Sequence, residues 1–160
     1  MYIHETQNWP NFTWNREQID AKLIKVSKAA GYLEGRLSAI GFDVQKQGAV
    51  EALTHDIVSS SEIEGVLLNS DQVRSSVARR MGVHITNETE PSHYIEGVVE
   101  MMLDAVNNYS SPLTDERLFG WHNCLFPTGR SGMEPIIVGQ YRVDPMDVVS
   151  GTWGREKVHY

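Results

Sequence analysis

Between residues 19 and 40 an apolar residue recurs at alternating spacings of four and three. This spacing is typical of a helix that buries one narrow face, and Gly41 is expected to end it. Gly31 and Gly35 lie inside this helix, where each costs roughly 1 kcal/mol of helix propensity. The close approach of a neighbouring helix would explain both glycines. The apolar positions are Ile19, Leu23, Val26, Ala30, Leu33, Leu37 and Ile40.

Similar periodicity predicts four further helices before Pro127. They are expected over residues 44–64, from Ser70 to a stop at Gly82, from Pro91 in a first turn, and from the N-cap Thr114. Their predicted apolar faces are Val50, Leu53 and Ile57 in the second helix, Val73, Val77 and Met81 in the third, and Ile95, Val98, Val99, Met102, Val106 and Tyr109 in the fourth.

After Pro127 the sequence changes character, because glycine and proline interrupt short apolar pieces. Residues 143–149 and 157–160 are predicted to form the two arms of a β-hairpin. The fold class expected from the whole pattern is therefore mainly α, a helical bundle with a C-terminal β-hairpin.

Composition excludes several classes of protein. The chain has 160 residues, enough for one domain with a core. Its 14 Lys and Arg against 21 Asp and Glu give a net charge of -7, the opposite of what a nucleic-acid binder usually carries. Cys124 is the only cysteine, which excludes an intramolecular disulfide and favours a reducing compartment. No signal peptide and no apolar run near the roughly 18 residues of a membrane span are present. We therefore expect a cytoplasmic protein that contacts neither nucleic acid nor membrane.

Two local patterns carry little chemistry. His122 and Cys124 are two residues apart, which places them on different faces of a helix, so no metal site is predicted. The glycines and Arg130 of the loop 127–132 are compatible either with an anion-binding loop or with a plain connection.

The segment 59–65 is the most informative one. The apolar periodicity of its helix predicts buried positions near Ser60, Ser61 and Glu64. A carboxylate on a buried face is costly unless it meets a cation or several hydrogen-bond donors, so Glu64 should have a specific partner. The alternative is that the helix end frays and leaves Glu64 in solvent.

This segment resembles a motif of a known family. Ser60-x-x-x-Glu64-Gly65 matches [ST]-x-x-x-E-[GN], the inhibitory motif of Fic proteins, which are protein adenylyltransferases. The chain also resembles Fic proteins at Tyr2-Ile3-His4, Trp9-Pro10, residues 73–80, Trp121-His122, Leu125-Phe126-Pro127, Gly139-Gln140-Tyr141-Arg142 and Lys157-Val158-His159-Tyr160.

The resemblance implies a regulatory N-terminal domain over residues 1–90 and the first part of a Fic core over residues 91–160. It implies that the intact protein uses ATP with Mg²⁺ to move AMP onto hydroxyl side chains of target proteins. Ser60, Glu64 and Gly65 would form the inhibitory motif, in which Glu64 pairs with the arginine that binds the γ-phosphate. The flap hairpin, from about Arg142 to Tyr160, would present its edge to an extended target segment, as in strand addition. The flap and target residues are Tyr141, Arg142, Val158 and His159.

The family's catalytic signature, H-x-F-x-[DE]-G-N-G-R-x-x-R, is absent from this sequence. The resemblance therefore places no catalytic residue in the chain, which is expected to be cut before the catalytic loop and inactive alone. In place of the missing partner of Glu64, the chain offers Arg74, Arg79, Arg80, Arg130 and Arg142.

The rival hypothesis is a helical protein-interaction or dimerisation module without enzymatic role. The heptad-like apolar positions of residues 19–40 favour it and make a homodimer possible. The reading frame after Tyr160 distinguishes the two hypotheses, because only a Fic protein would encode the catalytic signature there.

Overall fold

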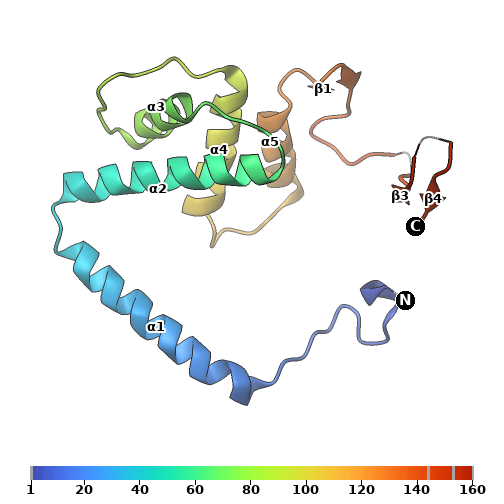
Figure 1. Ribbon diagram of the computed structural model, residues 1–160, viewed down its shortest axis with the longest axis horizontal. Helices are drawn as coiled ribbons and strands as arrows, with labels where there is room; N and C mark the ends of the chain where they lie inside the picture. Colours follow the sequence, from blue (N-terminus) through green and yellow to red (C-terminus); the bar gives the residue numbers. More distant parts are fainter. Residues whose placement is uncertain (1, 144, 153, 160) are drawn as a thin grey trace. The chain divides into compact units, whose positions relative to one another are not determined.

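The computed structural model describes residues 2–143, 145–152 and 154–159, and it divides into two compact units, Met1–Lys46 and Gln47–Tyr160. Its elements are mainly α-helical, as predicted, with small antiparallel hairpins near the C-terminus (Figure 1). No described helix is both long and apolar enough to span a membrane.

The first unit contains the 3₁₀ turn η1 (Ile3–Glu5), the helix α1 (Arg16–Ser38) and the first turn of α2 (Phe42–Ile63). Asn15 caps α1 by accepting a hydrogen bond from the Gln18 amide at 3.1 Å. The helix ends at Ser38, earlier than the predicted stop at Gly41. The side-chain amide of Gln45 donates to the Leu37 and Ile40 carbonyls, at 2.9 and 2.6 Å, and holds the corner after α1.

The apolar face predicted for α1 is present as a pattern, but it is not buried. No α1 side chain is buried, and Leu23 and Leu33 remain 54% and 57% exposed. The physical reason is that α1 is the one long helix of its own unit. The predicted close approach at Gly31 and Gly35 is also absent, because a Cβ added at either position meets no described atom within 4 Å.

The second unit holds the hydrophobic core. It comprises the rest of α2 with α3 (Ser70–Met81), α4 (His93–Asn107) and α5 (Asp115–Leu125). Helix α4 packs against α3 and α5 and lies between them in Figure 1. The buried apolar residues come from α2, α3 and α4: Val50, Ile57, Val73, Val77, Ala78, Ile95, Val98 and Val99.

The C-terminal end of α3 and the N-terminal end of α5 agree with the sequence prediction. Gly82 ends α3 in the left-handed conformation at φ 66°, and the Thr114 hydroxyl caps α5 by accepting from the Arg117 amide at 3.3 Å. The start of α4 differs, because Ser92 is its N-cap and Pro91 lies before the helix. Its predicted apolar face also ends early. Val106, in the last turn, and Tyr109, beyond the helix, are 46% and 84% exposed.

Two short hairpins follow α5. β1 (Arg130–Ser131) pairs with β2 (Glu134–Pro135), which the sequence analysis did not predict, and β3 (Val149–Ser150) pairs with β4 (Lys157–Val158). The second is the predicted hairpin with a much shorter ladder. Pro145 lies in the expected first arm and has no N–H to donate to a ladder. Positions 144 and 160 of the expected arms lie outside the described residues.

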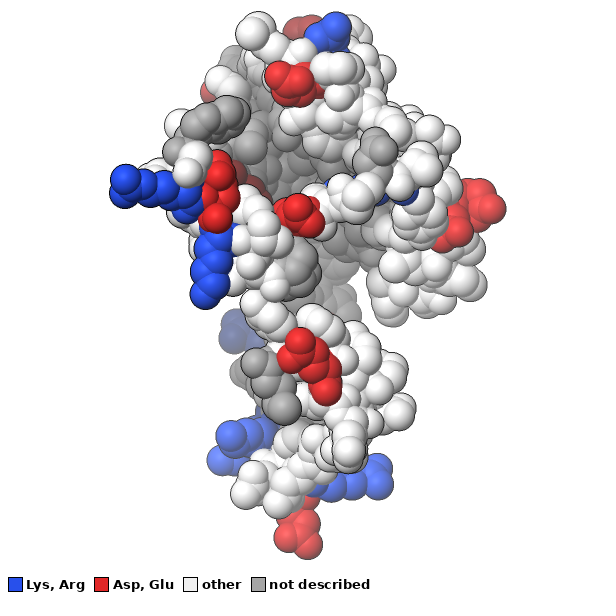
Figure 2. Space-filling model, turned by 90° about the vertical axis from the view of Figure 1, so that its right-hand side faces the viewer, with Lys and Arg blue, Asp and Glu red and all other residues white. Residues whose placement is uncertain are grey.

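Charged side chains do not form one continuous field on the face shown in Figure 2. There, acidic and basic residues are interspersed among uncharged ones.

Candidate functional site

The turn after α2 is fixed by backbone hydrogen bonds. The Gly65 amide donates to the Glu62 carbonyl at 2.9 Å, and the Val66 amide donates to the Ser61 carbonyl at 2.8 Å. Gly65 has φ 79°, so the pair of bonds forms a Schellman motif with glycine at the left-handed position. Gly65 therefore lets the chain turn directly after α2, because glycine adopts a positive φ without strain.

Glu64 is exposed at this turn, one residue beyond the end of α2. The prediction of a buried carboxylate is therefore wrong in this chain. The helical periodicity stops at Ile63, so position 64 no longer follows the apolar face. Ser61 is half-buried and Ser60 is exposed.

Ser60, Ser61 and Glu64 nevertheless border a common cavity of about 180 Å³. Its other walls are apolar or aromatic and come from α2, the turn after it, α4 and α5. They are Ile57, Val66, Tyr94, Val98, Met101, Met102 and Leu125. The cavity thus combines an apolar interior with one carboxylate and two hydroxyls at its edge.

Three of the five arginines named as substitutes for the missing partner of Glu64 form ion pairs with other carboxylates. Arg74 pairs with Glu51 at 2.6 Å, and Arg80 pairs with Glu96 and Glu100 at 3.0 and 3.1 Å. Arg79 lies 3.7 and 3.8 Å from carboxylate oxygens of Glu90 and Glu96. In the described part of the chain, Glu64 has no ion pair.

A second cavity lies over α5. The chain segment that follows α5 packs against one face of this helix. The Tyr141 hydroxyl donates a hydrogen bond to the Asp115 carboxylate at 2.7 Å. The rings of Tyr141 and Phe119 meet edge-on, with their centroids 5.1 Å apart. Gly139 approaches Asn123 so closely that a Cβ there would lie 2.8 Å from its side-chain nitrogen. Asp115, Phe119 and Asn123 are spaced by four residues and so share one face of α5. The bond to Asp115 raises the pKa of Tyr141.

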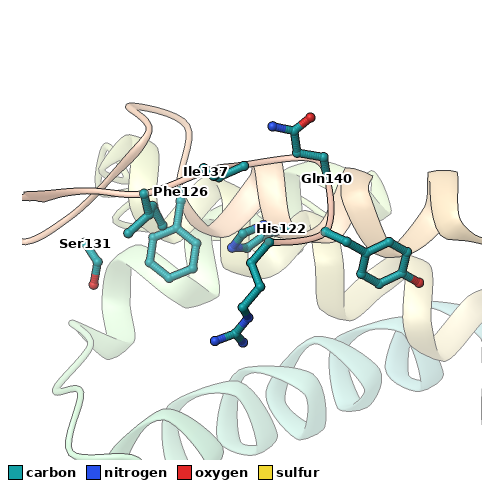
Figure 3. A pocket seen from close by; sticks show the side chains of 8 residues that line it. His122, Phe126, Ser131, Ile137 and Gln140 are labelled. Carbon is teal, nitrogen blue, oxygen red and sulfur yellow. The ribbon is translucent and has the colours of Figure 1, made fainter. Parts of the chain in front are cut away.

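The cavity beside these anchors measures about 500 Å³. Figure 3 shows the rings of Phe126 and His122 below the segment that carries Ile137 and Gln140. The two rings meet edge-on with centroids 5.2 Å apart. Tyr141 and Arg142 both line this cavity, so the structure brings these two predicted residues together.

Val158 and His159 do not line that cavity. Val158 lies on β4 opposite Val149, and the His159 ring nitrogen Nε2 is 2.6 Å from the Ser150 hydroxyl across the same hairpin. The four residues predicted for target binding therefore fall into two separate places.

Among the described residues, no group of three or more His, Cys, Asp or Glu side chains could hold a metal ion. Cys124 is half-buried on α5, and burial raises the pKa of its thiol.

A cluster around Asp104 joins α4 to α5 and was not identified from the sequence. The Asp104 carboxylate accepts hydrogen bonds from Asn108, Arg117 and Trp121, each at 2.7 Å. The bonds from Asn108, Arg117 and Trp121 hold the pKa of Asp104 at about 2. The residue types alone contain no signal for it, because its donors are 4 to 17 positions away.

The Asp104 cluster predicts an acid-sensitive step in stability. A carboxyl group whose pKa is lowered by folding stabilises the folded state above its unfolded pKa, near 3.8, and loses that contribution as the pH falls towards about 2. We expect Asp104→Asn to reduce stability at pH 6 and to flatten its decline between pH 4 and 2. The midpoints of urea unfolding, measured between pH 6 and 2 for the wild type and the variant, test this expectation. An unchanged slope would show that Asp104 does not titrate as the geometry requires.

Comparison with protein families gives one match. Residues 2–83 match the family described as Domain of unknown function (DUF4172). This match covers half of the chain. The chain belongs to the DUF4172 family. A search of the curated proteins finds no match.

The DUF4172 match contains α1, α2 and α3. It therefore includes Ser60, Glu64 and Gly65, but only part of the cavity that they border. The α4 and α5 walls of that cavity, and the whole of the larger cavity over α5, lie beyond the DUF4172 match.

Proposed function

We propose that this chain is the N-terminal regulatory part of a protein that transfers AMP from ATP to hydroxyl side chains of target proteins, and that Glu64 inhibits the transfer. The proposal combines the resemblance of the sequence to Fic proteins with one structural observation. The Glu64 carboxylate lies exposed at the edge of a cavity, without an ion pair among the described residues.

The arrangement supports an inhibitory role in two ways. The Schellman turn fixes the backbone at Glu64. Its carboxylate can accept two parallel hydrogen bonds from a guanidinium, and such charge-assisted bonds are among the strongest in proteins. If the rest of the intact protein covered the cavity, its apolar walls would exclude water from this pairing and strengthen both the pairing and the repulsion of a triphosphate. ATP and Mg²⁺ would be held by the part of the intact protein that carries the catalytic signature.

The first test is AMP transfer itself. We expect the isolated chain to label no protein when it is incubated with ATP radiolabelled on the α-phosphate and a cell lysate. Among the residues that the structure describes, no set could both remove a hydroxyl proton and hold a triphosphate. The intact gene product, purified and assayed in parallel, should label at least one protein. Labelling that depends on the isolated chain alone would contradict the proposal.

A helical interaction module is the second candidate, favoured by the unburied apolar face of α1. The same assay separates the two. If the intact product transfers no AMP with or without Glu64, and the chain forms a stable dimer by light scattering, the interaction module is the better assignment.

A further inference from the structure

The cavity over α5 shares lining residues with a second cavity of similar size. This second cavity measures about 550 Å³, and Phe126 and Ser131 line both. Its remaining walls are Val66, His93, Tyr94, Leu125, Pro127, Thr128, Arg130 and Gly132. We call the two cavities together the Phe126 groove. Each half contains one arginine and one histidine, namely Arg142 with His122 and Arg130 with His93.

The two arginines of the groove differ from the arginines of α3 and α5. Arg74, Arg79, Arg80 and Arg117 all pair with carboxylates. Arg130 instead donates to the Met133 carbonyl at 2.6 Å, and Arg142 contacts the Met146 sulfur. Neither forms an ion pair with any carboxylate of residues 2–143, 145–152 and 154–159. In a chain of net charge -7, two guanidiniums without a carboxylate partner, one in each of two cavities that share Phe126, form a local site for negative charge.

We propose that the Phe126 groove binds an extended acidic segment of a partner protein, with an apolar side chain against Phe126 and a carboxylate in each half. A peptide fits better than a small anion because the two arginines line different cavities with an aromatic side chain between them. In an extended peptide, residues two apart lie on the same face, so a glutamate, a leucine and a second glutamate at alternate positions can enter together. The proposal concerns binding alone and stands apart from AMP transfer.

Several contacts fix the loop that lines the groove. The Tyr141 hydroxyl donates to Asp115, and Gly139 packs closely against the Asn123 side chain. The Ile136 amide donates to the Gly129 carbonyl at 2.9 Å. The loop that carries both arginines is therefore fixed to α5 or to itself at several points. Binding needs little further ordering of this loop, which lowers its entropic cost.

The test is direct binding of a labelled peptide to the full chain. The probe is a fluorescein-labelled seven-residue peptide with a central leucine and a glutamate two positions to either side, measured by fluorescence anisotropy at low salt. Arg130→Gln and Arg142→Gln should each weaken binding by about two- to fivefold, the range for exposed charge pairs, and more together. Binding should also weaken with added salt.

One control tests whether the position of the arginine matters, and the other tests whether the charge of the peptide matters. Arg155→Gln removes an arginine that lines neither cavity and should leave binding unchanged. The peptide with glutamine in place of both glutamates should bind distinctly more weakly. Equal binding of the two peptides, or an equal loss with Arg155→Gln, would overturn the proposal. Displacement of the peptide by ATP at the same concentration would assign the groove to a nucleotide and overturn it too.

Discussion

Replacing Glu64 with glycine in the intact protein is expected to raise AMP incorporation, including modification of the protein itself. The carboxylate would no longer engage the arginine that binds the γ-phosphate, nor repel the incoming triphosphate. Hydrogen bonds to charged groups contribute roughly 1.5–3 kcal/mol, so the rate should rise roughly 10- to 100-fold. Because Glu64 lies beyond the end of α2, glycine there costs the helix little. Initial rates at several ATP concentrations, at equal folded protein, measure the effect.

Two further variants separate inhibition from a general change in the helix end. Glu64→Gln keeps the size of the side chain but removes its charge, and should also raise the rate. Glu62→Gln removes an exposed carboxylate two positions away that does not border the cavity, and should change nothing. Equal rates for the wild type and both Glu64 variants would rule out the inhibitory role and leave Glu64 as a solvated residue at the helix end.

The features that the sequence predicted well are local ones. Thr114 and Gly82 lie where a side-chain cap and a left-handed glycine are needed, and each acts on neighbouring backbone groups. Periodicity also identified the buried residues Val73 and Val77 of α3 and those of the first turns of α4, but it missed Ala78. It failed at Glu64, because it extended the helix to residue 64, whereas α2 ends at Ile63 and the chain turns at Gly65.

The features that the sequence missed depend on distant residues. Periodicity shows that α1 has an apolar face but not which element covers it. The Phe126 groove brings together Arg130 and Arg142 from a loop that carries no regular pattern, with His93 from another helix. Which glycines lie at a close approach of two helices also depends on distant residues. Gly31 and Gly35 were expected at a close approach, whereas the structure places Gly97 at one.

Gly97 lies where α4 packs against α5, and Gly97→Ala is expected to destabilise this unit. A Cβ at position 97 would lie 1.9 Å from the Cys124 carbonyl oxygen and 2.8 Å from its carbonyl carbon. Both are backbone atoms of α5, so the two helices must separate. Overpacking of this kind costs about 1–3 kcal/mol or more, and it should exceed the gain of roughly 1 kcal/mol in helix propensity.

Gly120→Ala is the matched control for this substitution. Gly120 is also inside a helix of the same unit, but a Cβ there meets nothing within 4 Å, so alanine should leave stability unchanged or raise it. The free energies of unfolding from urea titrations give the comparison. Val98 and Leu125 are next to the two residues that would clash, and both line the cavity that Glu64 borders. Separating α4 from α5 should therefore also disturb that cavity. If Gly97→Ala were as stable as Gly120→Ala, the tight crossing would be wrong, and with it the spacing of the walls on which the Glu64 site depends.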